Sequence, residues 1–144
     1  MATLAQDSTW TDRGMVTGHY AQKVLNYTDS IKRFVERAKA PDIDASIWEE
    51  LSEIIDVDRF ERVGNDKAAM GWDVYRELLL KWGSTTDFWA EFHRISEVGR
   101  RVFLELTEHN HPRGGVESVV NSCTVYQFDE AGKLVHLDIY LQHD

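Results

Sequence analysis

Residues 116–141 constrain the fold of this chain more than any other stretch, because they have the pattern of two strands joined by a tight turn. The first arm is rich in Val, Thr, Tyr and Phe, whose branched or aromatic side chains favour a pleated sheet. The turn falls at residues 129–132, which read Asp-Glu-Ala-Gly. In the second arm the apolar residues recur with period two, namely Val135, Leu137, Ile139 and Leu141. One face of this hairpin is therefore predicted to be buried.

Two more long strands are predicted just before this hairpin, at residues 87–97 and 101–110. Short turns at residues 98–100 and 112–115 contain the glycines that such connections favour. Because every connection is short, the four strands should form an antiparallel meander.

Three segments before the meander have the spacing of amphipathic helices. Over residues 17–38 apolar side chains recur three or four positions apart, which places them on one helix face. A second helix is predicted from Ser46, and a third over residues 71–82 with Gly83 as its C-terminal cap. With one short strand at residues 57–63, this element order predicts an α+β layer fold.

Composition indicates one compact domain at residues 17–144, preceded by a polar arm at residues 1–16. A formal net charge of −9 would repel nucleic acid and anionic membrane surfaces, so we expect neither as a partner. The single cysteine, Cys123, has no partner for an intrachain disulfide, and the chain contains no apolar run of membrane-spanning length. We therefore expect a soluble, cytoplasmic protein.

The closing hairpin also resembles a known family. Residues 128–134 (FDEAGKL), followed by Ile139 and Tyr140, are similar to the last hairpin of the NTF2-like superfamily, and Gly71 stands where that family opens its third helix. Ketosteroid isomerases, SnoaL-type polyketide cyclases and limonene epoxide hydrolase share this cone-shaped fold. The resemblance implies three N-terminal helices packed on a curved, mainly antiparallel sheet, and chemistry that needs no metal or cofactor. The shared core of the helices should contain Phe34, Trp48 and Leu79.

The resemblance also identifies positions at which the family carries catalytic residues. Glu61 stands where ketosteroid isomerases hold their general base, whereas Phe34 and Thr124 stand at their oxyanion-hole positions. Ile139 occupies the position of the catalytic aspartate of SnoaL-type cyclases, and Glu105 that of the arginine of limonene epoxide hydrolase. Each precedent is therefore incomplete in this chain.

Strand parity divides residues 101–110 into two sets that face opposite ways. If the parity follows the resemblance, the pocket-facing set is Phe103, Glu105, Thr107 and His109. The outer set is then Val102, Leu104 and Leu106, an apolar patch that predicts a homodimer through the outer sheet face. With the opposite parity Glu105 would simply be solvated.

His93 and Trp89 on the preceding strand are further candidates for the pocket. The His93 imidazole could exchange a proton near neutral pH if Glu105 lies beside it, although a single histidine in an aromatic strand is more often structural. Hydrogen bonds to a bound oxygen could come from Thr124 and Tyr126. The apolar wall is expected to include Leu137 and Ile139 from the last strand. His109 and His111 lie too near a turn, without a third ligand, to predict a metal site.

Two functional classes follow from these residues. The first is a cofactor-independent isomerase, cyclase or dehydratase acting on a hydrophobic, oxygenated ring compound, with Glu61 or a Glu105–His93 pair moving a proton. The second is a non-catalytic module of the same fold that binds a small molecule or takes part in an assembly. The fold alone does not distinguish them.

Overall fold

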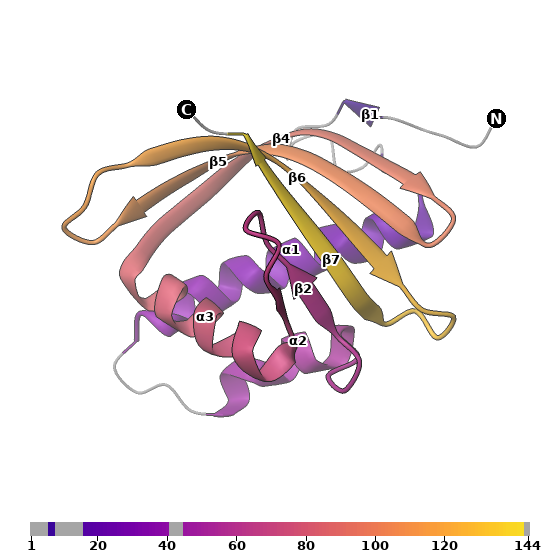
Figure 1. Ribbon diagram of the computed structural model, residues 1–144, viewed down its shortest axis with the longest axis horizontal. Coiled ribbons are helices and arrows are strands. Elements are labelled where there is room, and N and C mark those ends of the chain that lie inside the picture. Colours follow the sequence, from indigo (N-terminus) through magenta and orange to yellow (C-terminus); the bar gives the residue numbers. More distant parts are fainter. Residues whose placement is uncertain (1–5, 8–15, 41–44, 143–144) are drawn as a thin grey trace.

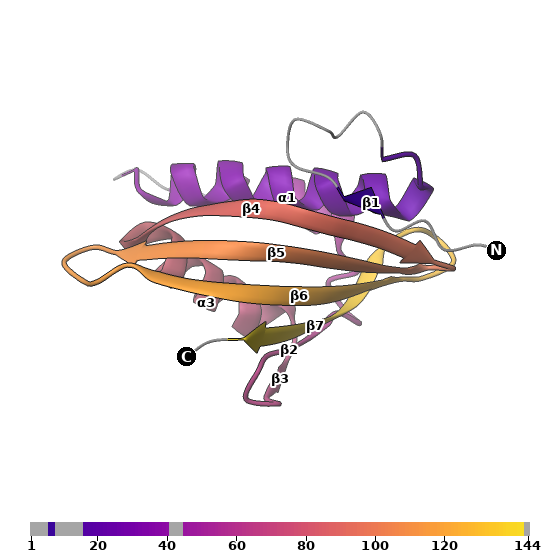
Figure 2. The same ribbon diagram turned by 90° about the horizontal axis from the view of Figure 1, so that it is seen from above.

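The computed structural model describes residues 6–7, 16–40 and 45–142 of the chain. Most of the expected N-terminal arm lies outside the described residues. Figure 1 shows one curved sheet whose described helices all lie on the same side of it, and Figure 2 shows the long strands running side by side along that sheet. This is the α+β layer arrangement expected from the order of elements.

Three helical segments pack under the sheet. Helix α1 (His19–Ala38) is long, and helix α3 (Trp72–Thr85) packs against it. Between α1 and α3 in the sequence, the expected second helix is divided into a 3₁₀ turn, η2 (Ala45–Trp48), and a short helix, α2 (Glu49–Ile54).

The sheet has the strand order β1-β4-β5-β6-β7-β2-β3. Its centre is an antiparallel meander, which confirms the predicted topology: β4 (Thr86–Val98), β5 (Arg101–Pro112), β6 (Ser118–Phe128) and β7 (Leu134–Gln142). The short strands flank it: β1 (Gln6–Asp7) pairs with β4, and β2 (Glu61–Val63) runs parallel to β7 and pairs with β3 (Ala69–Met70). The sheet is therefore mixed but mainly antiparallel.

The parity predicted for β5 is wrong. Val102, Leu104 and Leu106 are 0%, 1% and 8% exposed and lie in the core beneath the helices, not on the outer face. Their neighbours Phe103, Glu105, Thr107 and His109 consequently face away from the helices. The more apolar set of an alternating strand lies on the covered face, because burying Val and Leu there removes more apolar surface from water.

The position predicted for Gly83 is also wrong, because this glycine lies inside α3 and not at the C-terminal cap of the helix. A β-carbon on Gly83 would lie 3.2 Å from Ala38 Cβ and 3.4 Å from Val35 Cα, both on α1. The glycine therefore serves the close packing of the two long helices, and α3 continues to Thr85. Phe34 and Leu79 lie in this core with Trp48 packed against it, as expected.

Candidate functional site

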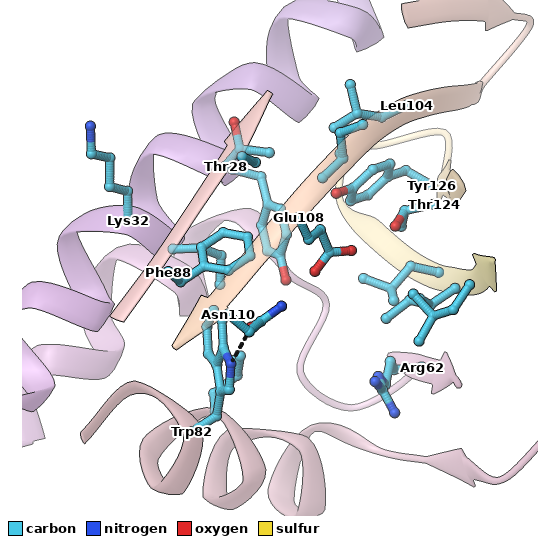
Figure 3. A pocket seen from close by; sticks show the side chains of 18 of the residues that line it. Thr28, Lys32, Arg62, Trp82, Phe88, Leu104, Glu108, Asn110, Thr124 and Tyr126 are labelled. Atoms are coloured by element: carbon cyan, nitrogen blue, oxygen red, sulfur yellow. Dashed lines mark hydrogen bonds between the residues drawn. The ribbon is translucent and has the colours of Figure 1, made fainter. Parts of the chain in front are cut away.

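A cavity of about 510 Å³ lies between the inner face of the sheet and helices α1 and α3 (Figure 3). Most of its wall is apolar and comes from α1, α3, β4, β5 and β7: Ile31, Leu78, Leu79, Phe88, Ala90, Phe92, Leu104, Leu106, Leu137, Ile139 and Leu141. This volume and lining are typical of a site for a small organic molecule.

Glu108 brings a carboxyl group into this apolar cavity (Figure 3). It lies on the same face of β5 as the buried leucines, and its cross-strand neighbours are Ala90 on β4 and Val120 on β6. Burial raises the pKa of the Glu108 carboxyl above its ordinary value, because the low-dielectric surroundings disfavour the charged form. Polar neighbours oppose the shift only in part: Ser122, Asn110 and Arg62.

Three tyrosines meet at the cavity wall. The hydroxyl groups of Tyr27 and Tyr75 are 3.3 Å apart, and the rings of Tyr27 and Tyr126 meet edge to face at 5.7 Å. Burial raises the pKa of all three phenols, so they remain protonated and can donate hydrogen bonds.

Trp82 holds the Asn110 side chain at the cavity wall. The indole Nε1 of Trp82 donates a hydrogen bond to Asn110 Oδ1 over 3.1 Å (Figure 3). Because an indole N–H can only donate, this bond fixes which side of the amide faces Trp82. The Asn110 N–H groups are thereby left to donate to other partners.

Arg62 carries a permanent positive charge at the cavity wall. The parallel pairing of β2 with β7 places Arg62 opposite Leu137, on the inner face of the sheet. Its guanidinium carbon lies 5.5 Å from the centre of the Tyr75 ring, within range of a cation–π interaction. Lys32 stands at the cavity rim, and its amine points away from the interior (Figure 3).

The three residues predicted from sequence to be catalytic lie outside this cavity. Glu61 precedes Arg62 on β2 and faces the other way, with its Oε1 atom 3.4 Å from His136 Nδ1. Glu105 is on the outer sheet face, where its Oε2 atom is 3.7 Å from Arg94 Nη1. His93 lies on the same outer face, beside a bulge in β4.

Of the residues predicted to bind a ligand, five line the cavity: Trp89, Thr124, Tyr126, Leu137 and Ile139. Trp89 does so only at the rim, since it is 54% exposed and stacks on His109. Phe34 is buried in the helical core and is not part of the lining.

The other three predicted ligand-binding residues, Phe103, Thr107 and His109, lie on the outer face. There His93 Nε2 lies 2.6 Å from the Thr107 hydroxyl, which in turn donates to Asn121 Oδ1.

Sequence reasoning missed Glu108, Arg62 and Tyr27. The signal for Glu108 was present, because Val102, Leu104 and Leu106 continue with period two into Glu108 and Asn110. Had the buried face been assigned to the most apolar set, the same alternation would have placed Glu108 in the pocket. Arg62 required the register between β2 and β7, for which the sequence contains no local signal.

Within the described residues, no group of three or more His, Cys, Asp or Glu side chains is arranged to hold a metal ion. None of the described helices is both long and apolar enough to cross a membrane.

Solved structures with the same architecture share little sequence with this chain. A protein described as a SnoaL-like polyketide cyclase from Jannaschia sp. CCS1 superimposes with a TM-score of 0.67 and 11% identity, covering 85% of each chain. The fold is NTF2-like. A limonene-epoxide-hydrolase-like enzyme of M. tuberculosis has a TM-score of 0.56 and 19% identity over 80% of this chain and 84% of its own.

A steroid delta-isomerase from Pseudomonas aeruginosa has a TM-score of 0.58 and 17% identity, covering 88% of this chain and 82% of its own. No family model and no curated protein matches the sequence. At these identities the likeness concerns the NTF2-like fold alone.

Proposed function

We propose that this NTF2-like protein is a cofactor-independent isomerase, cyclase or dehydratase that acts on a hydrophobic, oxygenated ring compound, with Glu108 moving the proton. The observation that carries the proposal is a single carboxyl group, Glu108, in a cavity whose wall is mostly apolar, with the pKa of that carboxyl raised by burial. A carboxyl group in such surroundings can exchange a proton with carbon more readily than one in water.

The reaction would begin with the Glu108 carboxylate removing a proton from a carbon next to a carbonyl group. Negative charge then develops on the carbonyl oxygen. One hydroxyl of the Tyr27–Tyr75 pair can donate a hydrogen bond to it, because the bond within the pair uses only one of the two protons. Protonated Glu108 returns the proton to another atom in an isomerisation, or to a departing hydroxide in a dehydration.

Glu61, Glu105 and His93 have no part in this proposal. Their side chains lie outside the cavity and make other contacts, so a substrate bound among the apolar residues would not reach them. They serve instead as matched controls, because Glu105 is the same residue type on the same strand as Glu108.

The test is a rate comparison that can be made before the natural substrate is identified. A panel of cyclic ketones, including β-tetralone and a steroid enone, is incubated with the protein in D₂O, and deuterium incorporation is followed by mass spectrometry. Glu108→Gln should lower the protein-dependent rate by about two to four orders of magnitude, whereas Glu105→Gln and Glu61→Gln should retain it.

The design also allows the proposal to fail. Equal rates for Glu108→Gln and wild type would exclude Glu108 as the proton carrier. If the wild type binds the ketones but exchanges none of their protons, a non-catalytic binding module becomes the better description.

A further inference from the structure

Arg62 places a permanent positive charge in the cavity lining and makes no ion pair with a carboxylate of the described residues. Its Nε atom is buried without a hydrogen-bond partner among the described residues, and none of their carboxylates lies within ion-pair distance of it. Several other arginines make ion pairs: Arg33 with Glu50, Arg59 with Asp56 and Asp129, and Arg94 with Glu105.

An unpaired guanidinium at an apolar wall is costly, because it loses water without gaining a counter-charge. The Tyr75 ring compensates for part of this cost but cannot accept the Nε hydrogen bond. Glu108 attracts the guanidinium electrostatically, since Arg62 partly opposes the rise in the Glu108 pKa, but the two side chains make no ion pair. An anionic oxygen of a bound molecule is a partner that would compensate for this cost.

Space for the guanidinium is provided by Gly64, two residues further along. A β-carbon at Gly64 would lie 2.7 Å from Arg62 Nη1, 3.3 Å from its Cζ and 3.3 Å from Asp66 Oδ1, so a larger residue would displace the guanidinium. The Arg62 side chain thus lies between the Tyr75 ring and the Gly64 backbone. This placement restricts its motion and favours the bidentate recognition of anions for which arginine is suited.

We propose that the cavity is a site for an organic anion: a ring compound whose carboxylate, sulfonate or ionised enol oxygen is bound by Arg62 while its rings pack on the leucine-lined wall. The inference deepens the proposed function by naming its ligand class, and it rests on that function only in taking this cavity as the ligand site. In Figure 3 Arg62 and Phe88 lie on opposite sides of Glu108, so a ligand held by Arg62 would pass its ring carbons beside the Glu108 carboxyl.

The test uses two fluorescent probes that share a ring system. Anilinonaphthalene sulfonate carries one negative charge, and N-phenyl-naphthylamine is its neutral counterpart; both become brighter in an apolar site. For the wild type the two probes should compete, and the anion should bind more tightly. Arg62→Met should weaken binding of the anionic probe about tenfold to a hundredfold, and binding of the neutral probe should remain.

Three further variants sharpen the result. Arg62→Lys keeps the charge and should retain part of the preference for the anion, whereas Gly64→Ala should reduce the preference by displacing the guanidinium. Arg101→Met makes the same change in charge at an exposed position outside the cavity and should have no effect. Retained binding of the neutral probe shows that each variant still has a folded cavity.

The proposal is overturned if Arg62→Met weakens both probes equally or neither, or if the folded wild type fails to bind the anionic probe. These outcomes are independent of the rate test for Glu108, because they measure binding without turnover. Conversely, a Glu108→Gln variant with full activity would reject the proton-transfer mechanism and leave the anion preference intact.

Discussion

Two glutamates three residues apart on β5 show how strongly side-chain direction determines chemistry. Glu105 faces the outer surface beside Arg94, where water screens its charge. Glu108 points into the cavity, where burial raises the pKa of its carboxyl. Successive side chains of a strand point to opposite faces, so residues separated by an odd number of positions lie on opposite faces.

At this scale we predict that stability depends on pH through Glu108. Because the pKa of its carboxyl is raised in the folded state, ionisation favours the unfolded state. The resulting cost is absent below the ordinary glutamate pKa and grows as the pH rises through the folded value. Glu108→Gln should therefore raise the melting temperature relative to wild type at about pH 8, and less at about pH 4.

Thermal unfolding followed by circular dichroism at the two pH values measures this difference. Glu105→Gln is the control and should show no such dependence. A Glu108→Gln variant whose gain was the same at both pH values would contradict the burial of an ionisable group.

At the scale of elements, one lysine ties the ends of the two long helices together. Lys39, directly after α1, donates hydrogen bonds from Nζ to the carbonyl oxygens of Val35, Gly83 and Thr86 at 3.3, 3.0 and 2.8 Å. The carbonyls of Val35 and Gly83 belong to the C-terminal ends of α1 and α3, where the helix dipoles favour a positive charge, and Thr86 begins β4. Lys39 therefore bonds to the carbonyl of Gly83, the residue at which α1 and α3 pack closely.

We predict that Lys39→Met lowers the free energy of unfolding by about 1–3 kcal/mol, because it leaves partly buried carbonyl groups without a donor. Urea denaturation measures the change. Lys81→Met, at an exposed position of α3, keeps the same substitution without these bonds and should change stability by less than about 0.5 kcal/mol. Equal effects of the two substitutions would show that the Lys39 contacts are not specific.

At the scale of the whole molecule, the described helices cover one face of the sheet, and none of them covers the other face (Figures 1 and 2). That outer face combines a hydrogen-bonded polar row, in which Thr107 donates to Asn121 and Asn121 to Gln142, with the half-buried apolar residues Phe103 and Val125. The apolar patch predicted for this face is inside the core instead.

A homodimer through this outer face stays a prediction, with Phe103 and Val125 replacing the buried residues as its apolar contacts. Light scattering at micromolar concentration should give twice the mass of the chain. Phe103→Glu should give the mass of a monomer, because it places a charge in the apolar part of the contact. The control Val116→Glu changes an exposed residue of the β5–β6 connection and should remain dimeric. A monomeric wild type would contradict the prediction.

The sequence by itself determined the long elements and their order. Apolar residues with period two predicted the four strands of the meander, helical spacing predicted α1 and α3, and short turns required antiparallel neighbours. These are local patterns, set by side-chain geometry over a few residues. For the same reason Thr124, Tyr126, Leu137 and Ile139 were correctly assigned to the pocket lining.

On β5 the more apolar alternating set, which leads from Leu106 to Glu108, already indicated the covered face. Only the tertiary structure decided which residue of β2 looks into the cavity. Glu61 and Arg62 are adjacent in sequence, and the pairing of Arg62 with Leu137, far along the chain, determines which of the two enters the site. Such long-range contacts leave no periodic trace in the sequence, because they depend on packing free energy summed over the whole core.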